Sequence, residues 1–121
     1  MRPITSVQDR LKEIAKLPDN WDSYGAVAYK TEDLEWAETL ILSLIEQGMP
    51  LPFIYPMSGD GLSLSLEWDN KNNTTVDINL RHKRAYLHSW NSQSNWVVDE
   101  TVYLDTQEGV KSMLKFVLDY A

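Results

Sequence analysis

The sequence predicts an α+β fold, in which an antiparallel meander of four to five strands packs against two N-terminal helices and one C-terminal helix. Apolar residues recur at helical spacing before residue 50 and after residue 105, and they alternate with polar residues in between. Short polar turns separate the alternating segments, as expected for neighbouring antiparallel strands. With 121 residues and 43% hydrophobic content, we expect one α+β domain spanning residues 1–121.

The first predicted helix opens at a capping box, Thr5-Ser6-Val7-Gln8, in which a hydroxyl is followed three residues later by Gln. The helix is expected to stop before Pro18, because proline restricts the residue that precedes it. One face of this helix is apolar and is expected to be buried: Val7, Leu11, Ile14 and Ala15.

The second predicted helix runs from Thr31, a plausible N-cap, to Gln47. Gly48 stands in the usual place for a helix-ending glycine, and Pro50 prevents the helix from resuming. The buried stripe is expected to comprise Leu34, Ala37, Ile41, Leu44 and Ile45.

From residue 52 the apolar period changes from 3.6 to 2, which indicates strands. The segment from Leu62 to Trp68, for example, alternates leucine and tryptophan with serine and glutamate. The strands are predicted at residues 53–55, 62–68, 75–80, 85–90 and 96–103.

The C-terminal helix is predicted to open at Asp105-Thr106-Gln107-Glu108, again in the manner of a capping box. Its apolar arc is wide, so we expect this helix to be well buried. The arc comprises Val110, Met113, Leu114, Phe116, Val117, Leu118 and Tyr120.

The net charge of −7 is concentrated in one segment, because residues 31–70 hold eight acidic residues and no Lys or Arg. The only cationic cluster is Arg81-His82-Lys83-Arg84, a short basic turn. A protein that grips nucleic-acid phosphates needs a broader basic surface, so nucleic acid is disfavoured as a partner.

The absence of cysteine excludes disulfides and thiolate metal sites. The N-terminal residues contain no apolar signal-peptide region, and no apolar run reaches the length of a membrane span. We therefore expect a cytoplasmic protein without a membrane partner.

The most distinctive segment is the loop Trp21-Asp22-Ser23-Tyr24-Gly25-Ala26. On a structural interpretation, Trp21 and Tyr24 fill the gap between two helices, Asp22 accepts backbone N–H bonds, and Gly25 adopts positive φ. On a functional interpretation, the same loop is a recognition surface. The residue types favour the structural interpretation.

The segment L-P-D-N-W-D-S-Y-G-A at residues 17–26, the G-D-G turn at residues 59–61 and L-S-L-E-W at residues 64–68 together carry a resemblance. The chain resembles a loose group of small uncharacterised bacterial proteins that share a W-D-x-Y-G-A loop and a later glycine turn with an L-E-W strand. The resemblance covers about the first half of the chain. It implies a bacterial or phage origin and no particular activity.

A second candidate site is one face of the predicted sheet. If Leu87 points to the core with Leu64 and Ile78, five polar and aromatic side chains project from the opposite face and form a surface that could bind a ligand or a partner. In the alternative arrangement, two aromatic residues of the same strand face the core and Leu87 lies under a loop. The sequence is compatible with both. The five residues are Glu67, Asp77, Tyr86, His88 and Trp90.

A third candidate is the acidic face of the second helix, with a tryptophan on its flank. Such a face commonly serves solubility. It could also dock a basic partner, as acidic inhibitors of nucleic-acid-binding proteins do, and the lack of any cation in residues 31–70 favours docking. The residues are Glu32, Glu35, Trp36, Glu38 and Glu46.

Catalytic and metal-binding patterns are not recognisable. His82 and His88 lack carboxylate partners at zinc-ligand spacing, and no glycine-rich phosphate loop opens a helix. We expect no catalytic residue, no metal and no cofactor. Glu67 and Asp77 could pair on adjacent strands, but isolated carboxylates on a sheet are common.

The sequence therefore favours a non-enzymatic protein-interaction module, an inhibitory or accessory partner of another bacterial or phage protein. Its expected partner is a protein with a basic surface, and a homo-oligomer is compatible with the same features. The alternative is a small enzyme or ligand-binding protein that uses the sheet face around His88.

Overall fold

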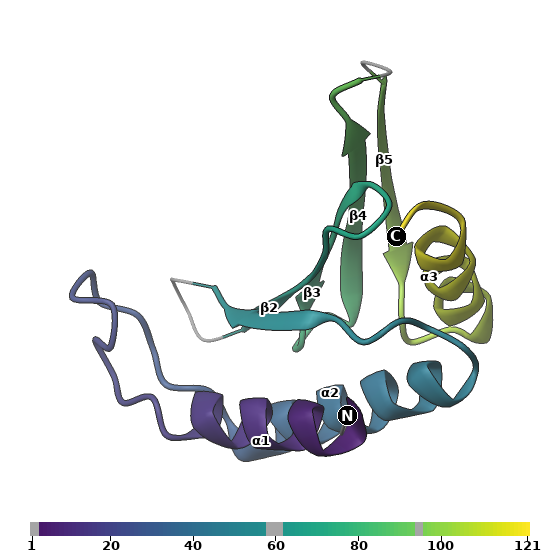
Figure 1. Cartoon of the computed structure of the whole chain (residues 1–121). Coiled ribbons are helices and arrows are strands. Elements are labelled where there is room, and N and C mark those ends of the chain that lie inside the picture. Colours follow the sequence, from purple (N-terminus) through teal and green to yellow (C-terminus); the bar gives the residue numbers. More distant parts are fainter. Residues whose placement is uncertain (1–2, 58–61, 94–95) are drawn as a thin grey trace.

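The computed structural model describes residues 3–57, 62–93 and 96–121 and confirms the predicted α+β architecture (Figure 1). The predicted glycine turn at residues 59–61 lies outside the described residues. The elements follow the order α1 (Pro3–Ala15), α2 (Thr31–Glu46), β1 (Phe53–Pro56), β2 (Ser63–Trp68), β3 (Asn73–Asn79), β4 (Arg84–Asn91), β5 (Trp96–Tyr103) and α3 (Gln107–Tyr120).

The strands form one antiparallel sheet in the order β1-β2-β3-β4-β5, so each strand pairs with its neighbour in sequence. Leu64 stands opposite Ile78, and Val76 stands opposite Leu87. Cross-strand partners project on the same face, and all four of these side chains are fully buried. This face of the sheet is therefore the core face.

The register decides between the two arrangements that the sequence left open for β4. Leu87 is on the core face, and side chains alternate along a strand. Tyr86, His88 and Trp90 consequently project from the opposite face, and both aromatic rings remain partly exposed.

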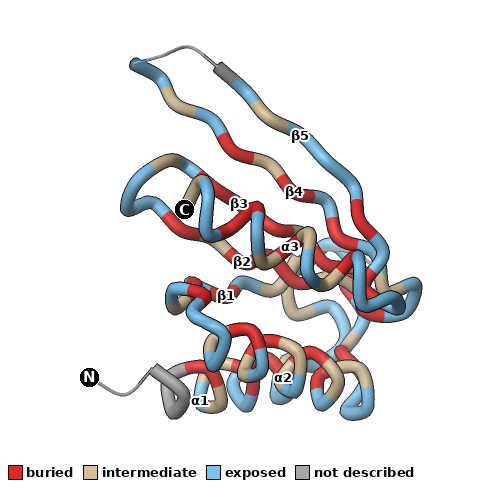
Figure 2. Tube along the Cα trace, turned by 90° about the vertical axis from the view of Figure 1, so that its right-hand side faces the viewer, coloured by how far each residue is buried: buried red, intermediate tan, exposed pale blue. Residues whose placement is uncertain are grey.

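Each helix lays an apolar stripe against the core face, which appears as the buried side of the helices in Figure 2. The stripes of α1 and α2 match the prediction at most positions, whereas α3 is less buried than predicted because Leu118 is 49% exposed. The fully or nearly fully buried helical residues are Val7, Leu11, Ile14, Leu34, Ala37, Ile41, Leu44, Met113, Phe116 and Val117.

Two predicted helix starts are wrong. The first helix begins at Pro3 rather than at Thr5, and proline suits a first helical turn because its missing N–H would have no partner there. The N-cap of α2 is Lys30 rather than Thr31, and no side chain caps it.

The predicted helix end at Gly48 is confirmed, whereas α3 is capped by Thr106 rather than by Asp105, the first residue of the predicted capping box. Gly48 follows α2 with φ of 105°, the left-handed conformation that ends many helices. The hydroxyl of Thr106 accepts a hydrogen bond from the backbone N–H of Gly109 at 3.0 Å and so caps α3.

The C-terminus of α3 is held by the turn between β2 and β3. The ammonium of Lys71 donates to the carbonyl of Asp119 at 3.1 Å, and the side-chain amide of Asn72 donates to the carbonyl of Tyr120 at 2.6 Å. These bonds satisfy carbonyls that have no partner within the helix.

The long connection between α1 and α2 is attached to the sheet through Tyr29. The phenol of this buried residue donates to the carbonyl of Ser63 at 2.5 Å and accepts from the backbone N–H of Met57 at 2.9 Å. The rest of the connection extends away from the body of the molecule (Figure 1).

In the described part of the chain, no helix is both long enough and apolar enough to span a bilayer.

Candidate functional site

Among the residues that the structure describes, no helix covers the face of the sheet opposite the core. In Figure 1 the three helices lie below and to the right of the strands, while the β4–β5 hairpin rises away from β2 and leaves the other face uncovered. We call this uncovered surface the open face. Its principal side chains are Phe53, Tyr55, Glu67, Thr75, Asp77, Arg84, Tyr86, His88, Trp90, Val97, Asp99 and Tyr103.

Most of the exposed large apolar side chains stand on the open face. Of the nine that the structure describes, six belong to this face. A concentration of exposed apolar side chains on one face is typical of an interaction site. The six are Phe53 (58% exposed), Tyr55 (42%), Tyr86 (43%), Trp90 (41%), Val97 (60%) and Tyr103 (55%).

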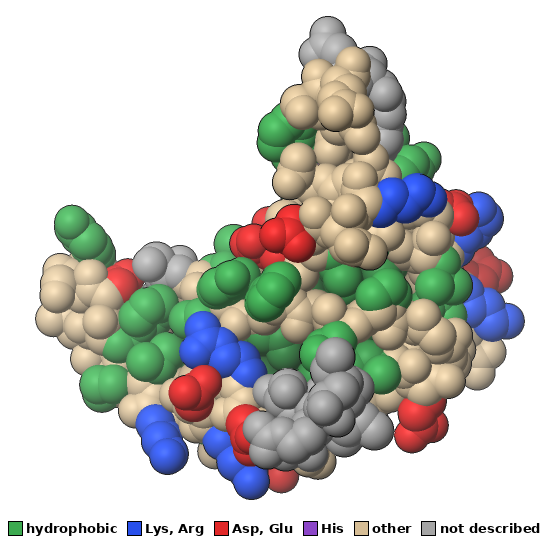
Figure 3. Space-filling view, viewed as in Figure 1, with side chains coloured by type: hydrophobic (Ala, Val, Ile, Leu, Met, Phe, Trp, Pro, Cys, Tyr) green, Lys and Arg blue, Asp and Glu red, His purple; other side chains and the backbone are tan. Residues whose placement is uncertain are grey.

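The open face is acidic as well as aromatic. Glu67, Asp77 and Asp99 project from it, and the only Lys or Arg on the sheet positions of this face is Arg84. In the space-filling view, acidic side chains adjoin hydrophobic ones at the foot of the rising hairpin (Figure 3). A surface of this composition attracts cations and repels phosphates.

His88, Tyr86 and Asp99 form a hydrogen-bonded cluster across β4 and β5. Nδ1 of His88 lies 2.5 Å from Oδ1 of Asp99, its register partner, and the phenol of Tyr86 donates to the same oxygen at 2.6 Å. The phenol and imidazole rings are stacked with centroids 6.2 Å apart.

The cluster changes the acidity of two of its members. The hydrogen bond from Tyr86, and after it the bond from His88, holds the pKa of Asp99 below its usual range. The hydrogen bond to Asp99 raises the pKa of Tyr86 above its usual value of 10.0, assisted by the negative charges of Asp99 and Asp77. The carboxylate therefore stays ionised and the phenol stays protonated near neutral pH.

The bond between His88 and Asp99 resembles one part of the catalytic centre of acyl-transfer enzymes. A histidine oriented by an aspartate occurs in hydrolases, and Thr75 is the register partner of His88 on β3. Acyl transfer also needs donors that stabilise an oxyanion, and the backbone N–H groups of the central strands are bonded to neighbouring strands, so such donors would have to be side chains.

A groove crosses the open face between the β1 edge and the rising hairpin. Its volume is about 340 Å³, and its lining contains neither Lys nor Arg. The aromatic side chains of Phe53, Tyr55 and Trp90 border it, together with the carboxylates of Glu67 and Asp69.

The acidic face of α2 offers a partner fewer accessible aromatic contacts than the open face does. Glu32, Glu35 and Glu46 are exposed and Glu38 is half-buried, as a solvated helix face would be. Trp36, the expected aromatic anchor, is half-buried and packs against the core. The ammonium of Lys83 lies 4.1 Å from the centre of its ring, so a cation of the same chain already occupies that surface.

The Trp21–Ala26 loop follows the structural interpretation in part. Oδ1 of Asp22 accepts the backbone N–H groups of Tyr24 at 2.9 Å and Ala26 at 3.1 Å, and Gly25 has φ of 85°. Trp21 is half-buried, and its indole N–H is enclosed without a partner among the described residues. The expectation that Tyr24 fills a gap is wrong, because Tyr24 is 92% exposed at the end of the loop.

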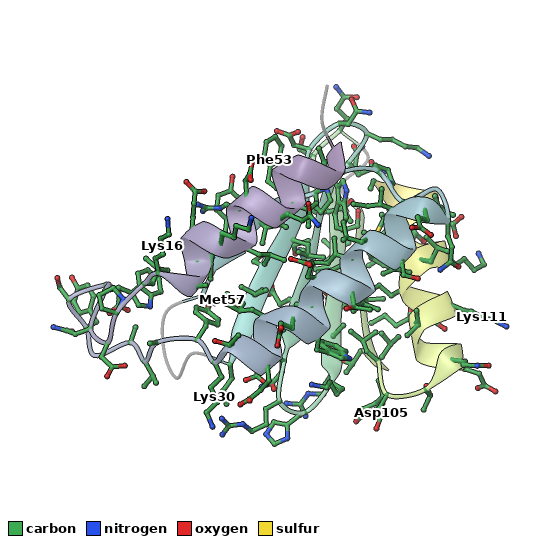
Figure 4. The ribbon with its side chains drawn as sticks, turned by 90° about the horizontal axis from the view of Figure 1, so that it is seen from below. Lys16, Lys30, Phe53, Met57, Asp105 and Lys111 are labelled. Carbon is green, nitrogen blue, oxygen red and sulfur yellow. The ribbon has the colours of Figure 1, made fainter. Side chains whose placement is uncertain are left out.

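Sequence reasoning missed seven of the twelve members of the open face: Phe53, Tyr55, Thr75, Arg84, Val97, Asp99 and Tyr103. The alternation of Phe53, Ile54 and Tyr55 was a usable signal, since the buried Ile54 leaves both aromatic rings on the opposite face. Figure 4 shows Phe53 beside α1. Asp99 could be found only from the register of the β4–β5 hairpin.

No cluster of three or more His, Asp or Glu residues in the described ranges is arranged to hold a metal ion. Comparisons of the chain with protein-family models, with curated proteins and with solved structures returned no match.

Proposed function

We propose that this protein is a non-enzymatic interaction module and that the open face of its sheet docks a basic surface of another protein. In keeping with the origin that the loop motif implies, the partner is a bacterial or phage protein that the module inhibits or assists. The concentration of exposed aromatic and acidic side chains on one uncovered face carries this proposal.

The composition of the face supports a protein partner. Aromatic side chains supply large contact areas at low entropic cost and dominate the energetics of many interfaces. The carboxylates of Glu67, Asp77 and Asp99 complement a basic surface and speed its association. The same charges oppose the phosphates of a nucleic acid.

The open face is a better docking surface than the acidic face of α2. The open face combines exposed rings with carboxylates, whereas α2 offers exposed carboxylates and a tryptophan already covered by Lys83. The glutamates of α2 would then contribute mainly to long-range attraction and to solubility.

A second candidate function is that of a small enzyme or ligand-binding protein centred on His88. The observation that favours it is the hydrogen bond between His88 and Asp99, which fixes the imidazole and leaves Nε2 without a hydrogen bond to the described residues. In that case His88→Ala would abolish function, and removing the aromatic rings elsewhere on the face would affect it little.

Affinity capture with paired surface variants tests the proposal. The sheet variant carries Tyr86→Ser and Tyr103→Ser, which remove two exposed rings. The matched helix variant carries Glu35→Lys and Glu46→Lys on the exposed side of α2. Tagged wild type and both variants are used to capture partners from the native host at two salt concentrations, after circular dichroism has verified folding.

We expect the wild type to retain a basic protein that the sheet variant loses and that the helix variant still binds with slower association. Capture should weaken at about 1 M salt, where charges are screened beyond about 3 Å. If only the helix variant loses partner capture, the proposal is overturned and docking through α2 is favoured.

A further inference from the structure

The groove on the open face has the composition of a receptor for a positively charged alkyl group. We propose that it binds a cationic side chain, lysine or arginine, that projects from the basic partner. This inference rests on the proposed function and assigns one contact within it. The aliphatic stem would lie against Phe53, Tyr55 and Trp90, and the charge would face Glu67 and Asp69.

The aromatic border favours a cation over a neutral group. The face of an aromatic ring is negative, and a cation within about 6 Å of its centre gains about 0.5–1 kcal/mol at an exposed site and more when desolvated. Three rings border one groove here, and each of them is 41–58% exposed and therefore accessible. The rings also provide apolar surface for the methylene groups of the side chain.

The carboxylates supply the opposing charge. Glu67 projects from β2 at the position opposite Phe53, and Asp69 follows immediately after that strand. Within the part of the chain that the structure describes, no Lys, Arg or His forms an ion pair with either carboxylate. Their charge is consequently available to an incoming cation.

Two basic side chains of neighbouring elements, Arg10 of α1 and Lys71 of the turn after β2, already have hydrogen-bond partners in the chain. Arg10 donates from Nε to the carbonyl of Ile54 at 2.7 Å, and its guanidinium carbon lies 6.0 Å from the centre of the Tyr55 ring. Lys71 donates to the carbonyl of Asp119 at the end of α3. Because Arg10 already contacts the Tyr55 ring, the incoming cation would lie chiefly against the rings of Phe53 and Trp90.

Charge complementarity excludes the other obvious occupants. A phosphate or a carboxylate would enter a groove whose described lining carries two negative charges and no Lys or Arg. A neutral sugar could stack on Trp90, but it would leave both carboxylates without a counter-charge. A cationic alkyl side chain can both pack against the aromatic rings and provide the counter-charge for the two carboxylates.

Short peptides titrated into the full chain and followed by NMR test the inference. The probes are acetylated, amidated Gly-Lys-Gly and Gly-Arg-Gly. The matched controls are Gly-norleucine-Gly, which keeps the stem without the charge, and Gly-Glu-Gly. The signals to follow are the indole N–H of Trp90, the ring protons of Phe53 and Tyr55, and the backbone amides of Glu67 and Asp69.

We expect saturable shifts of these signals with the lysine or arginine peptide, at an affinity at least tenfold above that of the norleucine peptide. Glu67→Gln should weaken the binding at least fivefold while leaving the spectrum of the core unchanged. Glu46→Gln, which removes an exposed carboxylate from α2, should have no effect.

Equal affinity for the norleucine and lysine peptides, tighter binding of the glutamate peptide, or shifts confined to the α2 surface would overturn the inference. The inference would also be overturned if no peptide shifted the NMR signals of the groove residues. The proposed function has a separate readout, because its sheet variant alters Tyr86 and Tyr103 outside the groove. If the sheet variant loses partner capture and the groove shows no preference for the lysine or arginine peptide, the proposed function stands and only this contact is overturned.

Discussion

His88 and Asp99 stand opposite each other on β4 and β5, with Nδ1 of the imidazole 2.5 Å from Oδ1 of the carboxylate. The phenol of Tyr86 donates to the same oxygen at 2.6 Å, so one carboxylate oxygen holds two rings on the open face. This shared acceptor links the outermost strand of the sheet to the aromatic surface that we propose as the docking site.

The first prediction concerns the acidity of Asp99. The hydrogen bond from Tyr86 is the largest cause of its lowered pKa, so Tyr86→Phe should raise the pKa of Asp99 toward its usual value. The measurement is a carboxyl-carbon NMR titration. Thr101→Ala, which alters the register partner of Tyr86 and leaves the bond intact, is the matched control. An unchanged Asp99 titration in Tyr86→Phe would contradict the geometry of the cluster.

The sign of the accompanying pH dependence follows from linkage. A carboxylate whose folded pKa is lowered contributes stability that is present above its unfolded pKa, near 3.8, and is lost as pH falls through the folded value. A phenol whose folded pKa is raised contributes stability that is present below 10.0 and is lost as pH rises through its folded value. Tyr86→Phe should therefore reduce both the acid and the alkaline dependence of the unfolding midpoint.

The second prediction concerns Gly109, where α3 crosses β5. A Cβ atom placed there would lie 1.6 Å from the backbone carbonyl oxygen of Tyr103, which cannot move as a flexible side chain could. Gly109→Ala should lower the free energy of unfolding by roughly 3 kcal/mol or more, the upper part of the range for overpacking. Urea denaturation measures this change. Lys111→Ala, at an exposed position of the same helix, should change it by less than about 0.5 kcal/mol.

The third prediction concerns Tyr29, which ties the connection between α1 and α2 to the sheet. Tyr29→Phe keeps the buried ring and leaves the carbonyl of Ser63 and the N–H of Met57 without their phenol partner. The free energy of unfolding should fall by about 0.5–1.5 kcal/mol, the usual net contribution of a hydrogen bond, because the Met57 N–H and the Ser63 carbonyl also bond to each other at 3.4 Å. Tyr24→Phe is the control, because Tyr24 is 92% exposed. Equal stability of the two variants would show that the phenol bonds of Tyr29 contribute nothing.

Much of the fold could be predicted because its signals are local. The serine–leucine alternation of β2 and the capping residues of α3 indicate structure within a few neighbouring residues. In β4, by contrast, Leu87 lies between Tyr86 and His88, and apolar side chains occupy both faces of the strand. Only pairing with β3 determines which face is buried, and pairing is a tertiary property.

The candidate site was harder to predict because its parts come together only through tertiary structure. The bond between His88 and Asp99 depends on where the β4–β5 hairpin turns. The cation of Lys83 over Trp36 joins the turn after β3 to α2, and this contact changes the interpretation of the acidic helix. Tyr24 projects into solvent because Asp22 and Gly25 complete the turn without it.

The fourth prediction concerns the two edges of the sheet. The β1 edge is short at four residues, includes Pro56, and has the carbonyl of Ile54 occupied by Arg10. The β5 edge has eight residues, pairs with β4 alone and is exposed along most of its length (Figure 2). Proline and side-chain coverage protect an edge strand, whereas a long open edge invites pairing with another chain.

Two adjacent carboxylates, Asp99 and Glu100, stand in the middle of the β5 edge. Antiparallel pairing of β5 with a second copy about its centre would bring these charges together with their counterparts, and like charges directly opposite are destabilising. Glu100→Gln removes one charge without altering the Asp99–His88 bond, so it should increase self-association at high protein concentration. Sedimentation equilibrium over a range of concentrations measures it, with Glu46→Gln as the control. If Glu100→Gln self-associates no more than the wild type, the charge of Glu100 does not protect this edge.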